Sequence, residues 1–562
     1  MADRLPLIVD SLTSTIKELP VGDDIDVGFG NIKNVNGIGA TSINITGVAT
    51  IAQLVASGVD LAPITEVTNY YVATNGDDVN GDGSAGSPWA TPHRAIDFLS
   101  SKRLKVTEGF PRVTINVGVG TYNFGLNQTA AGSGYITGNY AVSGGNGTGA
   151  VVGISTVGSA TGAVTGIRLL DPGTDYTASD TLGINTTTGT GCAFEPFHVG
   201  SSGEILGALR LNHPDGNQIV LAGADVTGTR PGRRGNHFYN QMGATDGSDP
   251  SAYTFSGNPS PYDASSPAGA YPNPMADGKG NTDASNVYNR SILETYYQSK
   301  LYFQGCDGII TRGTNPAKIN KFAIFGQKAD GSRVTADDLS TSGISNSALV
   351  GVSTADGLSA PVGQIRGGNF DLGDDISIHG FTYGIYMIGG LGKGAFTTIT
   401  NTGSVGLIAN RNCYVTIVEP TILNNVSHSC YSYAGTYYTY GGSLSNNGNI
   451  GALNYYGGFA FLGNNRADTV GFAKSTIIAN NDIGVLAQNN SNIRVDGRYS
   501  QELFIYGNDD AQIVARKGGV VDRQGANITV EAAHGNATLA NPALNTSGNG
   551  GAMIVTQSSP AF

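Results

Sequence analysis

The chain has 562 residues, of which 83 are glycine and only 13% are charged, and its formal net charge is -12. This composition argues against a helical bundle and favours short strands joined by tight turns, where glycine and asparagine adopt corner conformations at low cost. The negative charge would repel a nucleic-acid backbone, so nucleic acid is not expected as a partner.

Residues 1–66 contain short apolar runs cut by glycine, and none of these runs could bury a core alone. The chain start has no apolar stretch of signal-peptide length, and no segment reaches membrane-spanning length, so we expect synthesis in a cytosol without membrane insertion. The stretches 5–10, 16–23 and 39–50 resemble the N-terminal segments of virion and tail proteins from marine and cyanobacterial phages. The resemblance implies that residues 1–66 attach the chain to other tail proteins of a virion made in the host cytoplasm.

Residues 67–126 begin with a predicted strand, a glycine-rich turn and a short helix. Tyr70–Val72 forms the strand, Thr91 is suited to cap the helix, and Pro92 is suited to its first position. An apolar face follows within residues 95–99, so the helix could cover the open end of a stack of strands.

The passage from Tyr70 to Asp97 resembles the first motif of pectate-lyase-like right-handed parallel β-helices, which are common in phage tailspikes and tail fibres. The resemblance implies an all-β solenoid in which this helix is the cap and Val113–Val117 lies in the first rung. We therefore expect a right-handed parallel β-helix with an inserted β subdomain and an extended N-terminal segment.

The remaining chain divides by composition. Residues 127–200 are predicted to form an inserted, outward-facing Gly-rich β subdomain, and residues 201–527 the main body of the parallel β-helix. Within that body, residues 229–297 are rich in Pro, Gly, Asn, Ser and Tyr, which is typical of a long surface loop. Residues 528–562 are expected to be a polar C-terminal tail.

Internal repetition supports a solenoid independently of the resemblance. Four similar fragments contain Gly384, Gly406, Gly451 and Gly484. The second interval is about twice as long as the first, and placing Ser429 in the missing position divides it almost evenly. The last interval then requires a loop of about ten extra residues. A period of about 22 residues suits a three-sided β-helix.

Asparagines recur with almost the same spacing. Asn401, Asn424, Asn446 and Asn480 follow the repeat period, and the longer interval is again the last. If each asparagine lies at an equivalent corner of strands stacked about 4.8 Å apart, their side chains would form a ladder.

Catalytic and metal-binding patterns are weak. Hydrolysis of a glycosidic bond needs two carboxyl groups about 5 to 9.5 Å apart, and the pairs with a one-repeat spacing are Asp509 with Glu531 and Asp482 with Glu502. Both pairs are better explained as solvated turn carboxylates, so we assign no catalytic residues and no cofactor. The histidines show no metal-ligand spacing. The four cysteines, Cys192, Cys306, Cys413 and Cys430, have no CxxC spacing and are interpreted as buried free thiols.

A weak calcium-binding signal is present in the turn after the first strand. Asp78, Asn80, Asp82 and Gly83 match the first half of an EF-hand loop, but Trp89 stands where the bidentate glutamate is required. An Asx-rich turn without metal is the favoured interpretation.

Tyrosines cluster in one part of the main body, where stacked strands could align them into a stripe. Such a stripe would serve either subunit contact and packing or the binding of a glycan. The candidate residues are Tyr431, Tyr433, Tyr437, Tyr438, Tyr440, Tyr455 and Tyr456.

These observations and the family resemblance together predict a structural component of a phage virion. The resemblance implies a homotrimeric tail fibre or tailspike that forms a rigid rod and contacts the host surface, with a cell-surface glycan as a further partner. Two alternatives stay open: a tailspike depolymerase, which would be a polysaccharide lyase or hydrolase, and a purely architectural protein of the neck, baseplate or capsid surface.

Overall fold

The computed structural model describes residues 55–56, 59–105, 111–227, 290–311, 313–332, 350–354, 368–423, 425–445, 447–463, 476–479, 481, 483–497, 503–506, 511–524, 528–530 and 553–557. The chain divides into two units, residues 1–52 and 53–562, and every described residue belongs to the second. The described part consists mostly of β-strands, which confirms the predicted all-β class.

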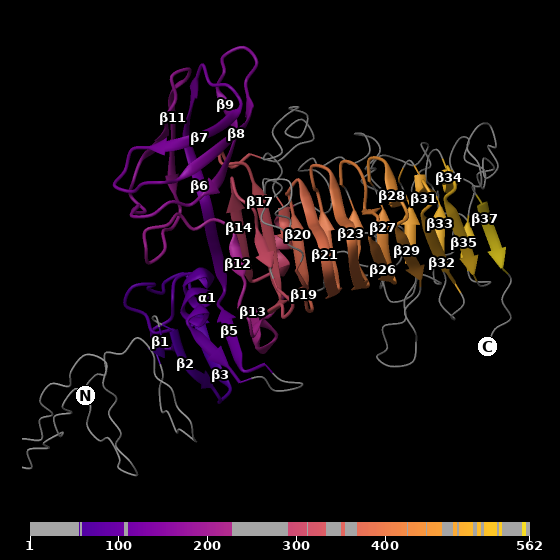
Figure 1. Ribbon diagram of the computed structural model, residues 1–562, viewed down its shortest axis with the longest axis horizontal. Helices are drawn as coiled ribbons and strands as arrows, with labels where there is room; N and C mark the ends of the chain where they lie inside the picture. The colour runs from indigo at the N-terminus through magenta and orange to yellow at the C-terminus, as the bar shows by residue number, and fades with distance from the viewer. Residues whose placement is uncertain are drawn as a thin grey trace, which may run out of the picture. The chain divides into compact units, whose positions relative to one another are not determined.

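Three series of parallel strands make up most of this unit (Figure 1). Series A contains β12 (Leu209–Leu211), β15 (Ile309–Thr311), β18 (Val350–Ser353), β21 (Tyr383–Ala395), β23 (Val405–Val418), β25 (Cys430–Tyr433), β28 (Ile450–Tyr455), β31 (Ile483–Gln488) and β34 (Ala511–Arg516). Series B contains β3 (Thr68–Val72), β5 (Val113–Val117), β13 (Ile219–Gly223), β16 (Lys318–Asn320), β19 (Phe370–Leu372), the second halves of β21 and β23, β26 (Thr436–Tyr440), β29 (Phe459–Gly463), β32 (Asn492–Asp496), β35 (Val520–Gln524) and β37 (Met553–Gln557). Series C contains the first part of β6 (Gly120–Ser133), β14 (Ser299–Gln304), β17 (Phe322–Gln327), β20 (Ile376–His379), β22 (Thr397–Thr400), β24 (Thr421–Leu423), β27 (Gly442–Ser445), β30 (Thr476–Ala479), β33 (Leu503–Tyr506) and β36 (Ile528–Val530).

The strand register confirms the repeat spacing predicted from the glycines. In series A, Ile385 pairs with Leu407, Leu407 with Cys430, Cys430 with Ala452, and Ala452 with Val485. These pairings align Ser429 with the glycines on either side, as predicted. We call the segments 383–404, 405–427, 428–449 and 450–482 repeats 1 to 4.

The core lies between the three series and is built from aligned apolar side chains. In series C one buried column holds the same kind of residue in strand after strand, because each residue pairs with its equivalent in the next repeat. This column consists of Ile378, Ile399, Ile422, Leu444, Ile478 and Ile505. The repeat glycines of series A face it: a Cβ added at Gly384 would lie 2.2 Å from Ile399 Cγ2, and one at Gly406 2.4 Å from Ile422 Cγ2.

A ladder of buried asparagines crosses repeats 2 to 4, one residue later than predicted. The Asn425 amide donates to Asn447 Oδ1, and the Asn447 amide donates to Asn481 Oδ1, each at 2.9 Å. Thr402 occupies the equivalent place in repeat 1 and donates through its hydroxyl to Asn425 Oδ1 at 2.8 Å. Of the predicted ladder residues, Asn424, Asn446 and Asn480 lie outside the described residues, and Asn401 directly precedes Thr402.

The predicted helix is present as α1 (Pro92–Ser100), which packs against the first strands of series A and B. Thr91 adopts an extended conformation and accepts a hydrogen bond from Arg94 N, as expected of an N-cap. Ala95 and Leu99 are buried in the common core. Beside the helix, β1 (Val55–Ala56), β2 (Val59–Ile64) and β4 (Lys102–Leu104) form a small separate sheet, and η1 (Gly216–Gln218) precedes β13.

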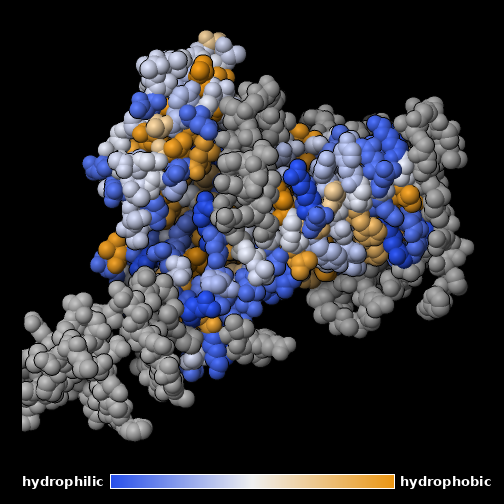
Figure 2. Space-filling model, in the orientation of Figure 1, coloured by the Kyte–Doolittle hydropathy of each residue, from blue (hydrophilic) through white to orange (hydrophobic). Residues whose placement is uncertain are grey.

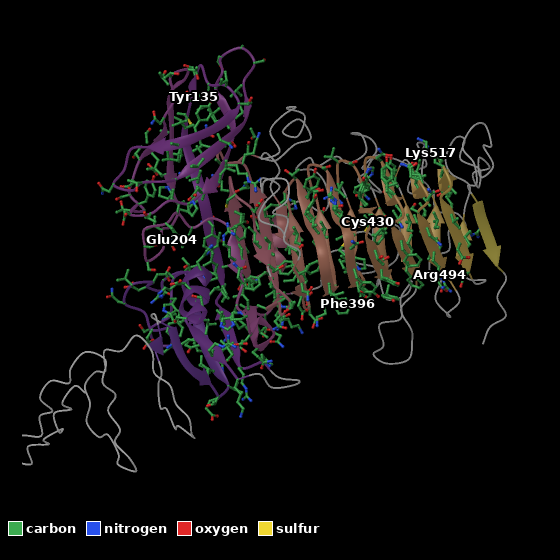
Figure 3. The ribbon with its side chains drawn as sticks, in the orientation of Figure 1. Tyr135, Glu204, Phe396, Cys430, Arg494 and Lys517 are labelled. Carbon is green, nitrogen blue, oxygen red and sulfur yellow. The ribbon has the colours of Figure 1, made fainter. Side chains whose placement is uncertain are left out.

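A Gly-rich module with its own hydrophobic core occupies the chain between β6 and β12. Unlike the three series it is antiparallel, and in Figure 1 it stands to one side of them. Its strands are the second part of β6, β7 (Gly138–Ser143), β8 (Val151–Val157), β9 (Val164–Asp171), β10 (Leu182–Ile184) and β11 (Thr190–Pro196). Tyr135, a core residue of this module, is labelled in Figure 3 at the end remote from the parallel strands.

One strand and one buried ion pair connect this module to the parallel strands. The first residues of β6 pair with β14 in parallel, and its later residues pair with β11 in the antiparallel module. Arg168 in β9 binds Asp307, which follows β14, with 2.6 Å between Nη2 and Oδ2, and both side chains are 5% exposed. The main chain of Leu169 also donates to Gly305 O at 2.8 Å.

The structure differs from two predictions, the long surface loop at 229–297 and the polar tail at 528–562. Most of the predicted loop at 229–297 lies outside the described residues, but its last part forms the helix α3 (Arg290–Tyr296). Leu293, Tyr296 and Tyr297 pack there in a small cluster with side chains of β14 and β17, which gives this segment a buried apolar anchor. In the predicted tail, β36 and β37 continue the parallel pairing beyond residue 527. No described helix is long and apolar enough to cross a membrane.

Candidate functional site

The candidate site is an aromatic surface on the outer side of series B. Side chains alternate along each strand, so that Val415 and Ile417 of β23 enter the core while Tyr414 and Val418 lie outside. The same alternation in the neighbouring repeats brings six outward side chains together. We call these residues the aromatic face: Leu391, Tyr414, Tyr438, Tyr440, Phe459 and Phe461.

The register explains how residues far apart in sequence meet on this face. Tyr438 pairs with Phe461 in the next repeat, and Phe461 pairs with Arg494 in the following strand. Beside this column, Leu391 pairs with Tyr414. Figure 2 shows pale orange atoms over β29, flanked by the blue, hydrophilic surface of β32 and β35.

The rings of the aromatic face contact one another from strand to strand. Tyr438 and Phe461 are stacked, with centroids 5.6 Å apart and an interplanar angle of 24°. Tyr414 lies 4.8 Å from Tyr438, and Tyr440 lies 5.3 Å from Phe461. The ring faces of Tyr438 and Phe461 are therefore turned toward neighbouring rings.

A second group of tyrosines borders the face at the corner that leads into β26 and β29. Tyr456 lies 4.2 Å from Tyr455 and 5.0 Å from Tyr433, measured between ring centroids. Tyr456 has a φ of 47°, a left-handed conformation that is costly for a bulky residue. Other repeats also have a positive φ at this corner, for example at Gly389, Arg411 and Ala434. An exposed ring is thus held here at a conformational cost.

Exposure sets this region apart from the rest of the described surface. Seven large hydrophobic side chains are exposed among the described residues, and three of them gather here: Leu391 at 59%, Tyr414 at 41% and Tyr456 at 50%. Contiguous exposed apolar side chains are typical of interaction sites.

Charged residues lie on both sides of the aromatic face and already have partners of opposite charge. On the side of repeat 1, Lys393 Nζ lies 3.0 Å from Asp371 Oδ2. On the other side, Arg494 Nε lies 3.5 Å from Asp496 Oδ2, and the guanidinium lies 6.0 Å from the centre of the Phe461 ring. Arg494 is labelled in Figure 3. The face is therefore an uncharged centre with a paired ionic border.

The seven tyrosines predicted as one stripe separate into four places. Tyr438 and Tyr440 belong to the aromatic face, and Tyr433, Tyr455 and Tyr456 form the adjacent corner. Tyr437 points into the core, where burial raises the pKa of its hydroxyl well above the usual value. Tyr431 belongs to series A, where it packs against a separate cluster that includes Leu453 and Leu486.

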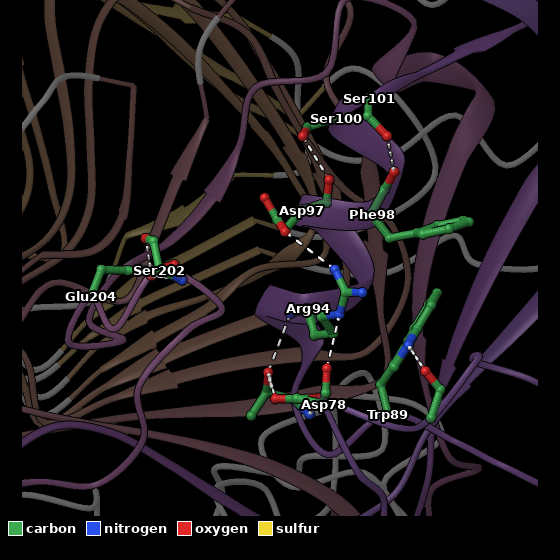
Figure 4. Close-up of polar contacts among 11 residues, drawn as sticks. Asp78, Trp89, Arg94, Asp97, Phe98, Ser100, Ser101, Ser202 and Glu204 are labelled. Atoms are coloured by element: carbon green, nitrogen blue, oxygen red, sulfur yellow. Dashed lines mark hydrogen bonds and ion pairs between the residues drawn. The ribbon is translucent and has the colours of Figure 1, made fainter. Parts of the chain in front are cut away.

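The three calcium candidates in the turn after the first strand each bind a different partner. The Asp78 carboxylate accepts hydrogen bonds from the main chain of Ala90 and the hydroxyl of Thr91, and so supports the start of α1 (Figure 4). Asn80 donates its amide to Asp77, and Asp82 accepts from the main chain of Ser84. These contacts are those of an Asx-rich turn, and no cluster of three metal-binding side chains occurs in the described part of the chain.

The structure describes the four cysteines but not the two carboxylate pairs. The four cysteines are buried and free, which confirms the interpretation as buried thiols. The carboxylate pairs Asp509 with Glu531 and Asp482 with Glu502 lie outside the described residues.

Comparison with protein-family models, with curated proteins and with solved structures finds no match to this chain. The functional interpretation therefore depends on the chain's own residues and on their arrangement.

Proposed function

We propose that this chain folds as a right-handed parallel β-helix and serves as a structural component of a phage virion. The offset between paired strands supports a helical coil, since each repeat contributes one strand to each of three parallel series. Parallel strands joined by crossovers are almost always right-handed. In this proposal, series A, B and C are the three sides of the coil.

The proposed role is a tail fibre or tailspike that forms a rigid homotrimeric rod and contacts the host surface. The observation that carries a mechanical role is the continuous stack of apolar columns, because such a stack transmits load from one repeat to the next. The first part of the stack also supports a mechanical role. The helix α1, whose N-cap Thr91 is bound by the Asp78 carboxylate, covers one end of the core. Residues 1–66 would attach the rod to other tail proteins.

Purified particles of the phage that encodes this chain provide the direct test. Mass spectrometry should detect the chain in the particles, and antibodies raised against the Gly-rich module should label the tail in electron micrographs. Absence of the chain from particles would overturn the virion role. Label confined to the neck, baseplate or capsid would replace the tail-fibre role with an architectural one.

A second experiment separates host contact from catalysis. The full-length protein is incubated with host cells and with their extracted surface polysaccharide, and both bound protein and glycan length are measured. Binding without shortening of the glycan is the expected result. Shortening would assign a depolymerase activity instead.

A further inference from the structure

We propose that the aromatic face is a contact surface between copies of this chain. This inference rests on the proposed trimeric assembly and names the surface through which the copies meet. Its starting point is the exposure of Leu391 and Tyr414 on strands whose inward residues form a complete core.

The orientation of the rings favours a protein partner over a glycan. A sugar binds an aromatic side chain through an open ring face, and its hydroxyl groups need hydrogen-bonding partners nearby. Tyr438 and Phe461 stack on each other, so one face of each ring is turned toward the other ring and is not open to a sugar. The side chains of Leu391, Phe459 and Phe461 have no polar atoms. Partly covered rings and apolar side chains pack well against another protein surface.

The charges around the face favour a second copy of the same chain. Copies of a chain with net charge -12 repel one another, and this repulsion costs least where the contacting surfaces carry no net charge. The face is uncharged, and each border carries both signs. On one side Lys393 and Lys318 flank Asp371, and on the other side Arg494 lies beside Asp496 and Asp522.

Parallel copies in register would meet at the same height along the stack. The aromatic strands of one copy would then face those of the next, and each ionic border would face a border that also carries both signs. An aromatic centre with a charged rim is the usual composition of a protein interface. The arrangement is therefore complementary to itself.

The test compares the mass of the full-length protein in solution with that of two double variants. Leu391→Glu with Tyr414→Glu places two carboxylates on the aromatic face at exposed positions, where the fold should tolerate them. Val67→Glu with Val119→Glu makes the same change of charge at side chains that are each 63% exposed and lie outside the face. Light scattering after gel filtration gives the mass, and circular dichroism verifies folding of each variant.

The expected result is three chains for the natural protein and for the control variant, and one chain for the face variant, a threefold fall in mass. If the face variant keeps three chains, the aromatic face is not the contact and the inference is overturned, while the trimeric assembly stands. A natural protein of one chain would overturn both. Loss of binding to host glycan without loss of mass would assign the face to the glycan and overturn the inference.

Photo-cross-linking gives a second readout that does not depend on a destabilising change. A benzophenone amino acid replaces Tyr414, which keeps an aromatic group at that position. Cross-links should join two full-length chains and map to the strands of the aromatic face. Cross-links to a surface on another series would overturn the inference.

Discussion

At the residue scale, the asparagine ladder shows how a polar side chain becomes structural. Asn447 is fully buried, and both its carbonyl and its amide are engaged by the repeats on either side. A buried polar group is favourable only when its hydrogen bonds are satisfied. The ladder therefore links repeats 2 to 4 and penalises any slip in their alignment.

Replacing Asn447 by alanine is expected to lower the stability of these repeats by about 2 to 4 kcal/mol, because the Asn425 main chain and amide and the Asn481 oxygen each lose a buried partner. Hydrogen exchange measured by mass spectrometry should become faster over β24, β27 and β28. The control is Asn116→Ala, which removes longer hydrogen bonds at the surface, of 3.4 Å to Asn69 and 3.3 Å to Tyr70. Equal exchange in the two variants would contradict the role of the ladder.

The sequence could predict that asparagines stack but not which ones. Asn424 and Asn425, Asn446 and Asn447, and Asn480 and Asn481 are adjacent pairs with the same period, so spacing alone cannot distinguish their members. The choice depends on which side chain turns inward at the corner. Leu391, Tyr414, Phe459 and Phe461 were not predicted for a different reason. The signal in the sequence is the dense run of tyrosines from Tyr431 to Tyr456, and these four residues lie outside it, although the repeat period places Thr416, Tyr438 and Phe461 at equivalent positions of successive strands.

At the element scale, the close approach of series A and series C explains the repeat glycines. Gly384 and Gly406 leave room for the branched Cγ2 of Ile399 and Ile422. Ser429 replaces glycine in the repeat whose facing residue is Leu444, which has no methyl group on Cβ. The period was predictable because this steric demand recurs in every repeat except that of Ser429 and so appears in the sequence.

Gly406→Ala should destabilise the protein by about 2 to 4 kcal/mol, since the new methyl group would lie 2.4 Å from Ile422 Cγ2 and 2.8 Å from Ser429 O. The readout is the thermal unfolding midpoint together with soluble yield. Gly86→Ala is the matched control, because an added Cβ there meets no atom within 4 Å. A midpoint for Gly406→Ala as high as that of the control would show that the strands can move apart without penalty.

Elements that depend on distant packing were not predictable in the same way. The helix α3 lies in a segment of loop-like composition, and the apolar residues that anchor it, Leu293, Tyr296 and Tyr297, find their partners on β14 and β17. The strand β37 follows a polar stretch, yet it pairs with β35. In both segments a few long-range contacts outweigh local composition.

At the scale of the whole unit, the Gly-rich module is held to the parallel strands by a buried ion pair. The Arg168 guanidinium and the Asp307 carboxylate are almost completely enclosed. Removing one partner from such a pair is far more costly than replacing both by apolar residues, because a lone charge is left without water.

Asp307→Ala is accordingly expected to lower the stability of the contact between the Gly-rich module and the parallel strands by about 3 to 5 kcal/mol. Limited proteolysis should then cut near residues 197–208. Repeats 1 to 4 should keep their protection against hydrogen exchange. The double variant Arg168→Met with Asp307→Leu should be cleaved more slowly than Asp307→Ala. If both variants resist proteolysis as well as the natural protein, the hydrogen bonds along β6 are enough to hold the module.

The unequal spacing of the repeats has a consequence for how such a chain can change over generations. Residues gained within a repeat, as between Ala452 and Val485, leave the distance between paired strands at one sheet spacing of about 4.8 Å. Duplication of a whole repeat would instead lengthen the stack by one such step. The length of the stack and the size of its lateral surface can therefore change independently. Duplication of whole repeats changes the length, and insertion of residues within a repeat changes the lateral surface.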